Sequence, residues 1–334
     1  MIEPGTPRPD PLQRNVRLER TMTIPVLGIP VRYESNDEAV IDAAEEAFGA
    51  WHVAEHVPQL LSEERVRIRI FVEEGRESRA EHTRITYRMP DQDRVLLRTS
   101  GSMAVADVAR RDSTAYVTRR LVNDTAHFRY GVLEAITLAI LTQLDRQPVH
   151  AAAITRDQAG LLLAGPSGTG KSTLTYAATR HGFKVLAEDM VYVQMRPRLR
   201  VWGLPGHLHL PASARRHFPE LATSLPTLLA NGKEKIAINL RTANALPDMP
   251  VAPRAGICVL ARSGGMPSLE TLSGDQLIEL MTSRLEPGFD VFAETVVPAI
   301  EMLARYGGWR LHLGDDPEDA IRFVEEMFLE IEGA

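Results

Sequence analysis

The chain has 334 residues, of which 25% are charged and 44% are apolar, and this composition suits a globular protein with one large or two medium-sized domains. A formal net charge of -6 offers no basic face, so general nucleic-acid binding is not expected. The single cysteine, Cys258, excludes a disulfide framework and a cysteine-based metal site, and we interpret it as a core thiol. No segment has the ~20 apolar residues that span a bilayer, and no secretory signal is recognised, so we expect a cytoplasmic protein without a membrane anchor.

The first part of the chain is predicted to hold a disordered arm and a small module. Residues 1–20 are rich in proline and arginine, which is typical of an unstructured arm. Residues 21–145 are expected to form an α+β N-terminal module without a catalytic pattern. Apolar spacing and strict alternation predict its elements. They are a helix over 37–48, strands over 66–72, 94–99 and 114–122, and a helix over 131–144.

Residues 146–334 are predicted to form an α/β catalytic domain. An apolar run over 149–154, interrupted by His150, indicates a strand, and the continuous run 161–164 is typical of a strand buried on both faces. A helix over 171–181 and a strand over 183–187 follow, then a hairpin of strands 191–194 and 199–202. Further strands are expected over 231–240 and 256–261, and helices over 274–285, 295–306 and 316–331.

A glycine-rich phosphate-binding pattern lies between the predicted strand 161–164 and the predicted helix 171–181. Glycines let the backbone turn tightly and point successive N–H groups at phosphate oxygens. Lys171 is expected to reach the β- and γ-phosphates of ATP, and the Ser172 hydroxyl to bind Mg²⁺. The alternative is a glycine-rich loop that binds no nucleotide. The expected nucleotide-binding residues are Gly165, Pro166, Ser167, Gly168, Thr169, Gly170, Lys171, Ser172 and Thr173.

Two adjacent acids, Glu188 and Asp189, end the predicted strand 183–187. They are expected at the sheet edge that carries the phosphate-binding loop, which is where ligands bind in open α/β sheets. A carboxylate there can help Ser172 hold Mg²⁺, and in a kinase one carboxylate must also accept the proton of the acceptor hydroxyl. The alternative is a pair of exposed loop acids without a catalytic role.

The spacing of these features resembles the catalytic core of HPr kinase/phosphorylase. His150 lies 21 residues before Lys171, and Asp189 lies 18 residues after it. The resemblance covers roughly residues 148–260 and is strongest over 150–194. It implies an HPr-kinase-like C-terminal catalytic domain, with Asp189 as the base that activates the acceptor hydroxyl and His150 beside the γ-phosphate. For His150, the alternative is a satisfied core residue.

Beyond the core, the resemblance is partial. It places Arg200 where the family has a metal-binding glutamate, which leaves the second carboxylate ligand in doubt. It also implies that Arg254 helps to neutralise the transferred phosphate, although a surface arginine is an equal alternative. Lys233 and Lys235 are either a further phosphate clamp or part of a charged hairpin turn. The family's downstream phosphorylase stretch is not recognisable, which argues against reversal of the phosphorylation.

Together these features predict an ATP- and Mg²⁺-dependent kinase that phosphorylates a serine-type hydroxyl of a peptide, protein or small molecule. The chain resembles HPr-kinase-related proteins of peptide-modifying gene clusters, some of which phosphorylate the C-terminal serine of a lasso-peptide precursor. The resemblance also makes a homo-oligomer plausible. The main alternative is a nucleotide-sensing regulator that transfers no phosphate. A phosphoenolpyruvate-carboxykinase-like enzyme ranks lowest, because no histidine and lysine pair is placed to bind its metal.

Overall fold

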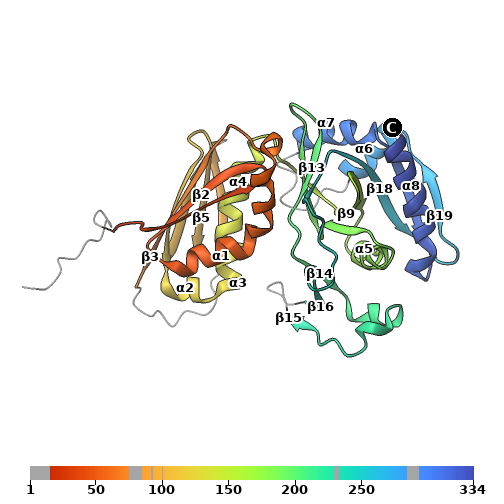
Figure 1. The fold of residues 1–334 in the computed structure, drawn as a ribbon, viewed down its shortest axis with the longest axis horizontal. Helices are drawn as coiled ribbons and strands as arrows, with labels where there is room; N and C mark the ends of the chain where they lie inside the picture. The colour runs from red at the N-terminus through yellow and green to blue at the C-terminus, as the bar shows by residue number, and fades with distance from the viewer. Residues whose placement is uncertain (1–15, 75–84, 92, 100, 229–232, 284–292) are drawn as a thin grey trace, which may run out of the picture. The chain divides into compact units, whose positions relative to one another are not determined.

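The computed structural model describes residues 16–74, 85–91, 93–99, 101–228, 233–283 and 293–334 (Figure 1). The chain is a mixed α/β protein rich in β-sheet. It divides into two compact units, one formed by Met1–Gly49 with Leu61–Ile140 and the other by Ala50–Leu60 with Leu141–Ala334. The second unit therefore includes a short segment from the N-terminal half of the sequence. No helix of the described residues is both long and apolar enough to cross a membrane.

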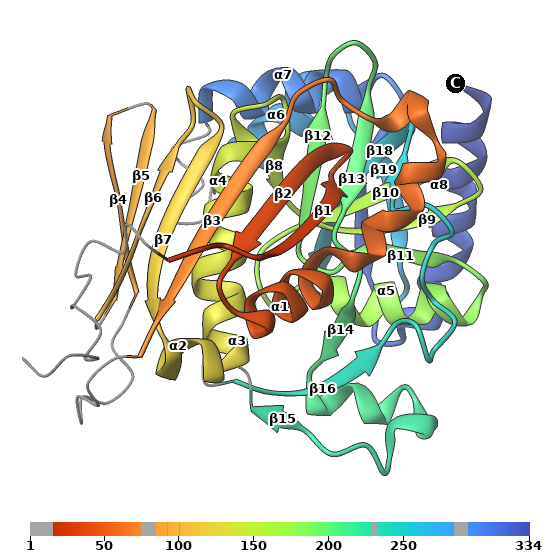
Figure 2. The same cartoon turned by 60° about the vertical axis from the view of Figure 1, so that its left-hand side comes forward.

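The first unit is built on one seven-stranded sheet in the order β1-β2-β3-β7-β6-β5-β4. Helices cover one face of this sheet (Figure 2), and that face carries the buried residues of alternating strands such as β3. The strands are β1 Arg20–Val26, β2 Ile29–Ser35, β3 Val66–Glu73, β4 Thr86–Asp91, β5 Arg94–Thr99, β6 Ser102–Asp107 and β7 Asp112–Thr118. The helices are α1 Glu38–Phe48, α2 Arg119–Asn123, α3 Thr125–Phe128, the π-helical segment η3 Arg129–Glu134, and α4 Ala135–Thr142.

Three predicted elements of this unit need correction. The predicted strand 114–122 ends at Thr118, because the Thr118 hydroxyl accepts the Leu121 N–H and caps helix α2. The predicted helix over 131–144 begins as a π-helix and becomes α-helical only at Ala135. The predicted arm over residues 1–20 overlaps strand β1, which begins at Arg20, while its residues 1–15 lie outside the described part of the chain.

The second unit is built around a six-stranded sheet in the order β11-β9-β10-β18-β20-β19. Strands β10, β18 and β20 run parallel, whereas β9 is antiparallel to both β10 and β11. Strands β10 and β11 consequently end at the same edge of the sheet. The strands are β9 Ala152–Arg156, β10 Ala159–Ala164, β11 Lys184–Ala187, β18 Arg254–Arg262, β19 Ser268–Thr271 and β20 Gly308–Leu313.

Two smaller sheets complete the β-structure of this unit. One, in the order β17-β13-β12-β8, contains the hairpin predicted from the sequence, with β12 (Met190–Gln194) antiparallel to β13 (Arg200–Gly203). Its other strands are β8 (Gln147–His150) and β17 (Val251–Ala252). The predicted single strand over 149–154 is therefore two strands in different sheets, with Ala151 between them. The third sheet consists of β14 His207–Leu210, β15 Thr227–Leu228 and β16 Glu234–Asn239.

Helices cover both faces of the six-stranded sheet, so β10 is buried on both sides, as its apolar sequence predicts. Alternate residues of β10 point into two different cores: Leu161 and Leu163 pack with α5 and α8, and Leu162 packs with α6 and α7. These helices are α5 Lys171–Arg180, α6 Gly274–Thr282, α7 Ala293–Ala304 and α8 Ile321–Gly333. Short helical turns are η1 Gly49–His56, η2 Pro58–Leu60, η4 Ala212–Arg216, η5 Pro219–Leu221 and η7 Pro317–Ala320.

Candidate active site

The glycine-rich loop connects the end of β10 to the start of α5 and depends on left-handed backbone at three positions. Gly165, Gly168 and Gly170 have φ values of 141°, 87° and 114°, which residues with a side chain rarely adopt. At Gly165 the space is also restricted, because a Cβ atom would lie 3.0 Å from the carbonyl oxygen of Leu260. Glycine at these positions is thus a physical requirement of this path from strand to helix.

Internal hydrogen bonds close the loop around its lysine. The backbone N–H and the hydroxyl of Thr169 donate to the Pro166 carbonyl at 3.2 and 2.8 Å. The Lys171 side chain is almost fully buried, and its Nζ donates to the Gly165 carbonyl at 2.6 Å. The lysine ammonium therefore lies at the beginning of the loop, where it can exchange this carbonyl for a phosphate oxygen.

The start of helix α5 supplies the second half of a phosphate site. Leu174 donates the first hydrogen bond into the helix, to the Gly170 carbonyl at 2.9 Å. The N–H groups of the first turn, which includes Ser172 and Thr173, point along the helix axis toward the loop, and the positive end of the helix dipole favours an anion there. The half-buried Ser172 hydroxyl stands in the position from which such a residue binds Mg²⁺.

Asp189 and His150 lie together at the loop's edge of the sheet. Asp189 follows β11, and His150 ends β8, where it is the register partner of Met190. The His150 Nε2 is 3.6 Å from the Asp189 Oδ1, with 19% of the histidine side chain and 67% of the aspartate side chain exposed. His150 also lines a cavity whose wall includes the first residues of the loop. An exposed carboxylate beside a shielded imidazole near the phosphate-binding loop is suited to proton transfer.

Glu188 has a different environment from its neighbour. Its Oε1 accepts the backbone N–H of His209 at 2.8 Å, and its Oε2 is 2.7 Å from the His209 Nδ1. Both side chains are about four-fifths buried. His209 was not predicted from the sequence to be a functional residue. Its signal was the alternation His-Leu-His-Leu over 207–210, which is strand β14 with the histidines on one face.

Arg200 serves the packing of its own unit. Its Nη2 donates to the Gln59 carbonyl at 2.7 Å, and its guanidinium lies 5.8 Å from the Trp202 ring. Burial, together with the nearby charge of Arg198, lowers the pKa of Arg200 below its ordinary value. The residue at the position of the expected carboxylate thus contacts the segment Ala50–Leu60 and provides no metal ligand.

The structure does not bring Arg254 to the site. Arg254 begins β18 opposite Ala159, the first residue of the parallel strand β10, and its Nη1 donates to the Glu332 carbonyl at 3.2 Å. The loop follows the other end of β10, a full strand length away, or about 16 Å at ~3.3 Å per residue. A contact between Arg254 and a phosphate on the loop is therefore incompatible with this register.

Lys233 and Lys235 lie beside the β15–β16 pair, where Lys235 is the register partner of Thr227. Both interpretations of the two lysines therefore stay predictions. The residues 229–232 that join the two strands lie outside the described part of the chain.

A magnesium site formed by Ser172 with Glu188 or Asp189 stays a prediction. In the described part of the chain, no group of three or more His, Cys, Asp or Glu side chains could hold a metal ion by itself. The donor set nevertheless suits Mg²⁺, which typically takes one or two protein oxygens and completes its octahedron with phosphate oxygens and water. A hydroxyl at the helix start and a carboxylate at the same sheet edge are oxygen ligands of this kind.

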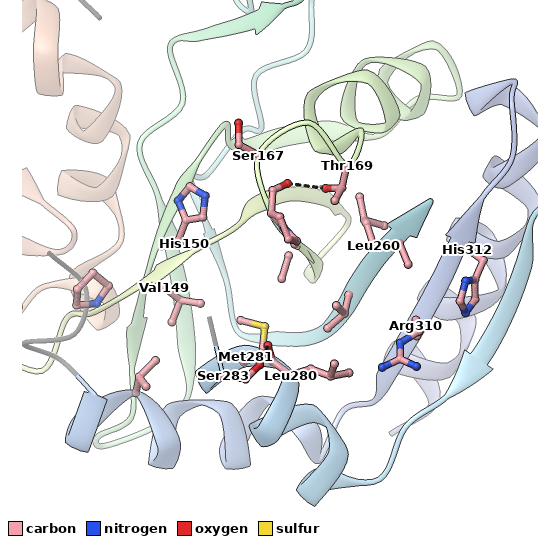
Figure 3. A pocket seen from close by; sticks show the side chains of 17 residues that line it. Val149, His150, Ser167, Thr169, Leu260, Leu280, Met281, Ser283, Arg310 and His312 are labelled. Carbon is pink, nitrogen blue, oxygen red and sulfur yellow. Dashed lines mark hydrogen bonds between the residues drawn. The ribbon is translucent and has the colours of Figure 1, made fainter. Parts of the chain in front are cut away.

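A cavity of about 640 Å³ lies directly beside the loop (Figure 3). The loop residues Gly165–Ser167 and Thr169 form one wall together with His150. Apolar side chains of β18, α6 and α7 form most of the remainder, and Arg310 and His312 of β20 lie on the side away from His150. The cavity has the size and mixed lining of a small-molecule site.

Known proteins give little evidence about the function of this chain. No family model matches the sequence, and no curated protein matches it. Among solved structures, the HPr(Ser) kinase/phosphatase from Coxiella burnetii matches with 14% sequence identity over 56% of this chain and 100% of that chain, at a TM-score of 0.30. At these values the similarity is distant, and it establishes neither the fold nor the activity of this chain.

Proposed function

We propose that this protein is an ATP-dependent kinase that transfers the γ-phosphate to a serine-type hydroxyl. The observation that carries the proposal is the position of the Asp189–His150 pair at the edge of the sheet that holds the phosphate-binding loop, with 3.6 Å between the imidazole nitrogen and the carboxylate oxygen. A loop alone indicates phosphate binding, whereas a carboxylate next to it can activate an acceptor.

Each residue has a defined part in the transfer. The loop and the start of α5 bind the phosphates, and Lys171 leaves the Gly165 carbonyl to stabilise charge on the transferred group. Asp189 accepts the proton of the acceptor hydroxyl while the oxygen of that hydroxyl bonds to the γ-phosphorus. The bond between the γ-phosphorus and the β–γ bridging oxygen breaks, and ADP is released. Mg²⁺, held by Ser172 and an acid, would neutralise charge on the β- and γ-phosphates.

The imidazole of His150 lies next to the Asp189 carboxylate. A separation of 3.6 Å is longer than a hydrogen bond, so in this state the imidazole and the carboxylate are adjacent without being bonded. Such contacts commonly shorten when substrate binds. We infer that His150 orients Asp189 and contacts the transferred phosphate.

A nucleotide-sensing regulator without phosphate transfer is the second candidate. It is favoured by the hydrogen bond from Lys171 to the Gly165 carbonyl, because a nucleotide must break this bond and so can change the conformation of the loop. A regulator would bind ATP or ADP tightly and would not need the base at Asp189.

The acceptor is proposed only as a class, a hydroxyl of a peptide, protein or small molecule. The C-terminal serine of a lasso-peptide precursor is one such acceptor, suggested by the resemblance of the sequence motifs. A cytoplasmic location, which supplies ATP, and a homo-oligomeric assembly belong to the same proposal.

The test is ATP consumption in the presence of a panel of hydroxyl acceptors, with ADP and inorganic phosphate measured separately and the acceptors analysed by mass spectrometry. A kinase produces ADP in excess of phosphate, and one acceptor gains the mass of a phosphoryl group. Tight nucleotide binding with no modified acceptor and no ADP across the panel would support the regulator instead.

A further inference from the structure

The cavity beside the loop shares part of its wall with the phosphate-binding backbone. Its wall contains the loop backbone at Gly165 and the ring of Pro166, so a ligand bound through phosphates on the loop could reach the cavity without leaving the protein surface. Its volume of about 640 Å³ exceeds what a phosphate chain needs. The cavity therefore has room for a group larger than the phosphates themselves.

The lining of the cavity is mainly aliphatic. Val259 and Ala261 of β18 and Val296 of α7 line it. Leu280 and Met281 of α6 line it as well (Figure 3). These walls offer no partners for the N–H and C=O groups that each residue of a peptide carries, and burying such groups unpaired is costly. A flat heterocycle, with two apolar faces and a polar edge, is better matched to this lining.

The polar groups of the cavity suit a neutral ligand edge. Arg310 and His312 lie on the side away from His150, and Glu270 is 3.6 Å from the Arg310 guanidinium and 4.0 Å from the His312 imidazole. Because the Glu270 carboxylate offsets the positive charge of Arg310, this group has both donors and acceptors without a strong excess of either sign. Such a set can bind the ring nitrogens and the amino group of a base, and it gives little reason for a second anion to bind.

We propose that this cavity is the nucleobase subsite and that it holds the purine ring of the nucleotide, with the aliphatic side chains against its faces and the Arg310–His312 side at its polar edge. The inference rests on the proposed function, because it requires that the loop bind a nucleotide. It assigns the cavity-lining residues of β18, α6 and α7 to nucleotide binding. The acceptor would then approach the loop from the side on which Asp189 is exposed.

The test compares two ligands that share the phosphates and differ in the base, ATP and inorganic tripolyphosphate, each with Mg²⁺. Ala261→Phe places a ring in the cavity at a half-buried position near the end of β18. We expect this variant to raise the Kd for ATP by about tenfold or more and to leave the Kd for tripolyphosphate within about twofold. Ala222→Phe, at an exposed alanine that follows η5 and lies outside the cavity lining, is the matched control and should change neither Kd.

The outcomes separate this inference from the proposed function. Wild-type protein that binds neither ligand refutes the nucleotide-binding function itself. Binding of both ligands that Ala261→Phe leaves unchanged overturns the nucleobase subsite, while the kinase proposal stands with the cavity available to the acceptor. If Ala261→Phe weakens both ligands, the smaller Ala261→Val decides: selective weakening of ATP supports the inference, and equal weakening of both ligands contradicts it.

Discussion

Glu188 and Asp189 are adjacent in the sequence, but their carboxylates have different environments. Both oxygens of Glu188 contact His209, whereas Asp189 is mostly exposed beside His150. Partners that orient a carboxylate near a metal are often as important as the ligand itself. At this scale Asp189 is the better candidate for the base, and Glu188 for a fixed group that supports Mg²⁺.

The first prediction concerns His209. His209→Ala should raise the Kd for MgADP by about tenfold, because the Glu188 carboxylate loses the side chain that fixes it. His209→Asn should recover most of the affinity, since an asparagine amide can donate to the same oxygen. Calorimetric titration of both variants checks this, and equal affinities in His209→Ala and wild type would show that His209 has no positioning role.

The second prediction is a pH dependence from Cys258. Burial raises the pKa of this thiol above its ordinary value of 9.0, so the unfolded chain ionises first and releases a proton. The stability is fully present below that value and falls as pH rises above it, by about 1.4 kcal/mol per pH unit for this one group. Chemical unfolding at several alkaline pH values should give a shallower slope for Cys258→Ala than for wild type; parallel slopes would contradict this account.

At the scale of the elements, the close approach of β13 to β11 fixes the position of the acids. A Cβ at Gly203, the last residue of β13, would lie 1.8 Å from the carbonyl oxygen of Leu186 in β11. Glu188 and Asp189 follow directly after β11, so a shift of this strand moves both carboxylates relative to the loop.

The third prediction follows from this contact. Gly203→Ala should lower the free energy of unfolding by roughly 2–4 kcal/mol, because the clash is with backbone and cannot be relieved by a side-chain rotation. Gly206→Ala is the control, since no atom lies within 4 Å of its Cβ position. Denaturant unfolding of the two variants makes the comparison, and equal stabilities would show that β13 and β11 are not held this closely.

Local signals in the sequence predicted the elements that carry the loop. The continuous apolar run and the glycine pattern specify β10, the turn and α5, and the predicted hairpin is β12 with β13. The break at Ala151 was not predictable, because apolar residues continue through it while β8 and β9 join different sheets. The partner of Glu188, the position of Arg254 and the cavity were also missed, since they depend on strand order and register.

At the scale of the whole molecule, the segment Ala50–Leu60 belongs to the unit that carries the candidate site. Trp51 is fully buried, and its ring centroid is 5.2 Å from that of Trp202 in β13. Arg200 of the same strand donates to the Gln59 carbonyl. A prediction from contiguous sequence could not reveal this, because the contact joins residues about 150 positions apart.

The fourth prediction is that Trp51→Ala destabilises the second unit. Loss of a buried tryptophan should cost about 3–5 kcal/mol, and hydrogen exchange should accelerate in β12 and β13. Val53→Ala, at an exposed residue of the same helical turn, should change little. Accelerated exchange confined to β1 and β2 of the first unit would contradict the assignment of the segment.

The fifth prediction tests the central claim most directly, by measuring phosphate transfer and ATP affinity side by side in Asp189→Asn. This substitution keeps the size of the side chain and removes its capacity to accept a proton, so the account predicts an unchanged Kd for MgATP and a transfer rate reduced by about a hundredfold or more. Transfer that continues at the wild-type rate in Asp189→Asn would contradict the assignment of the base and, with it, the proposed mechanism.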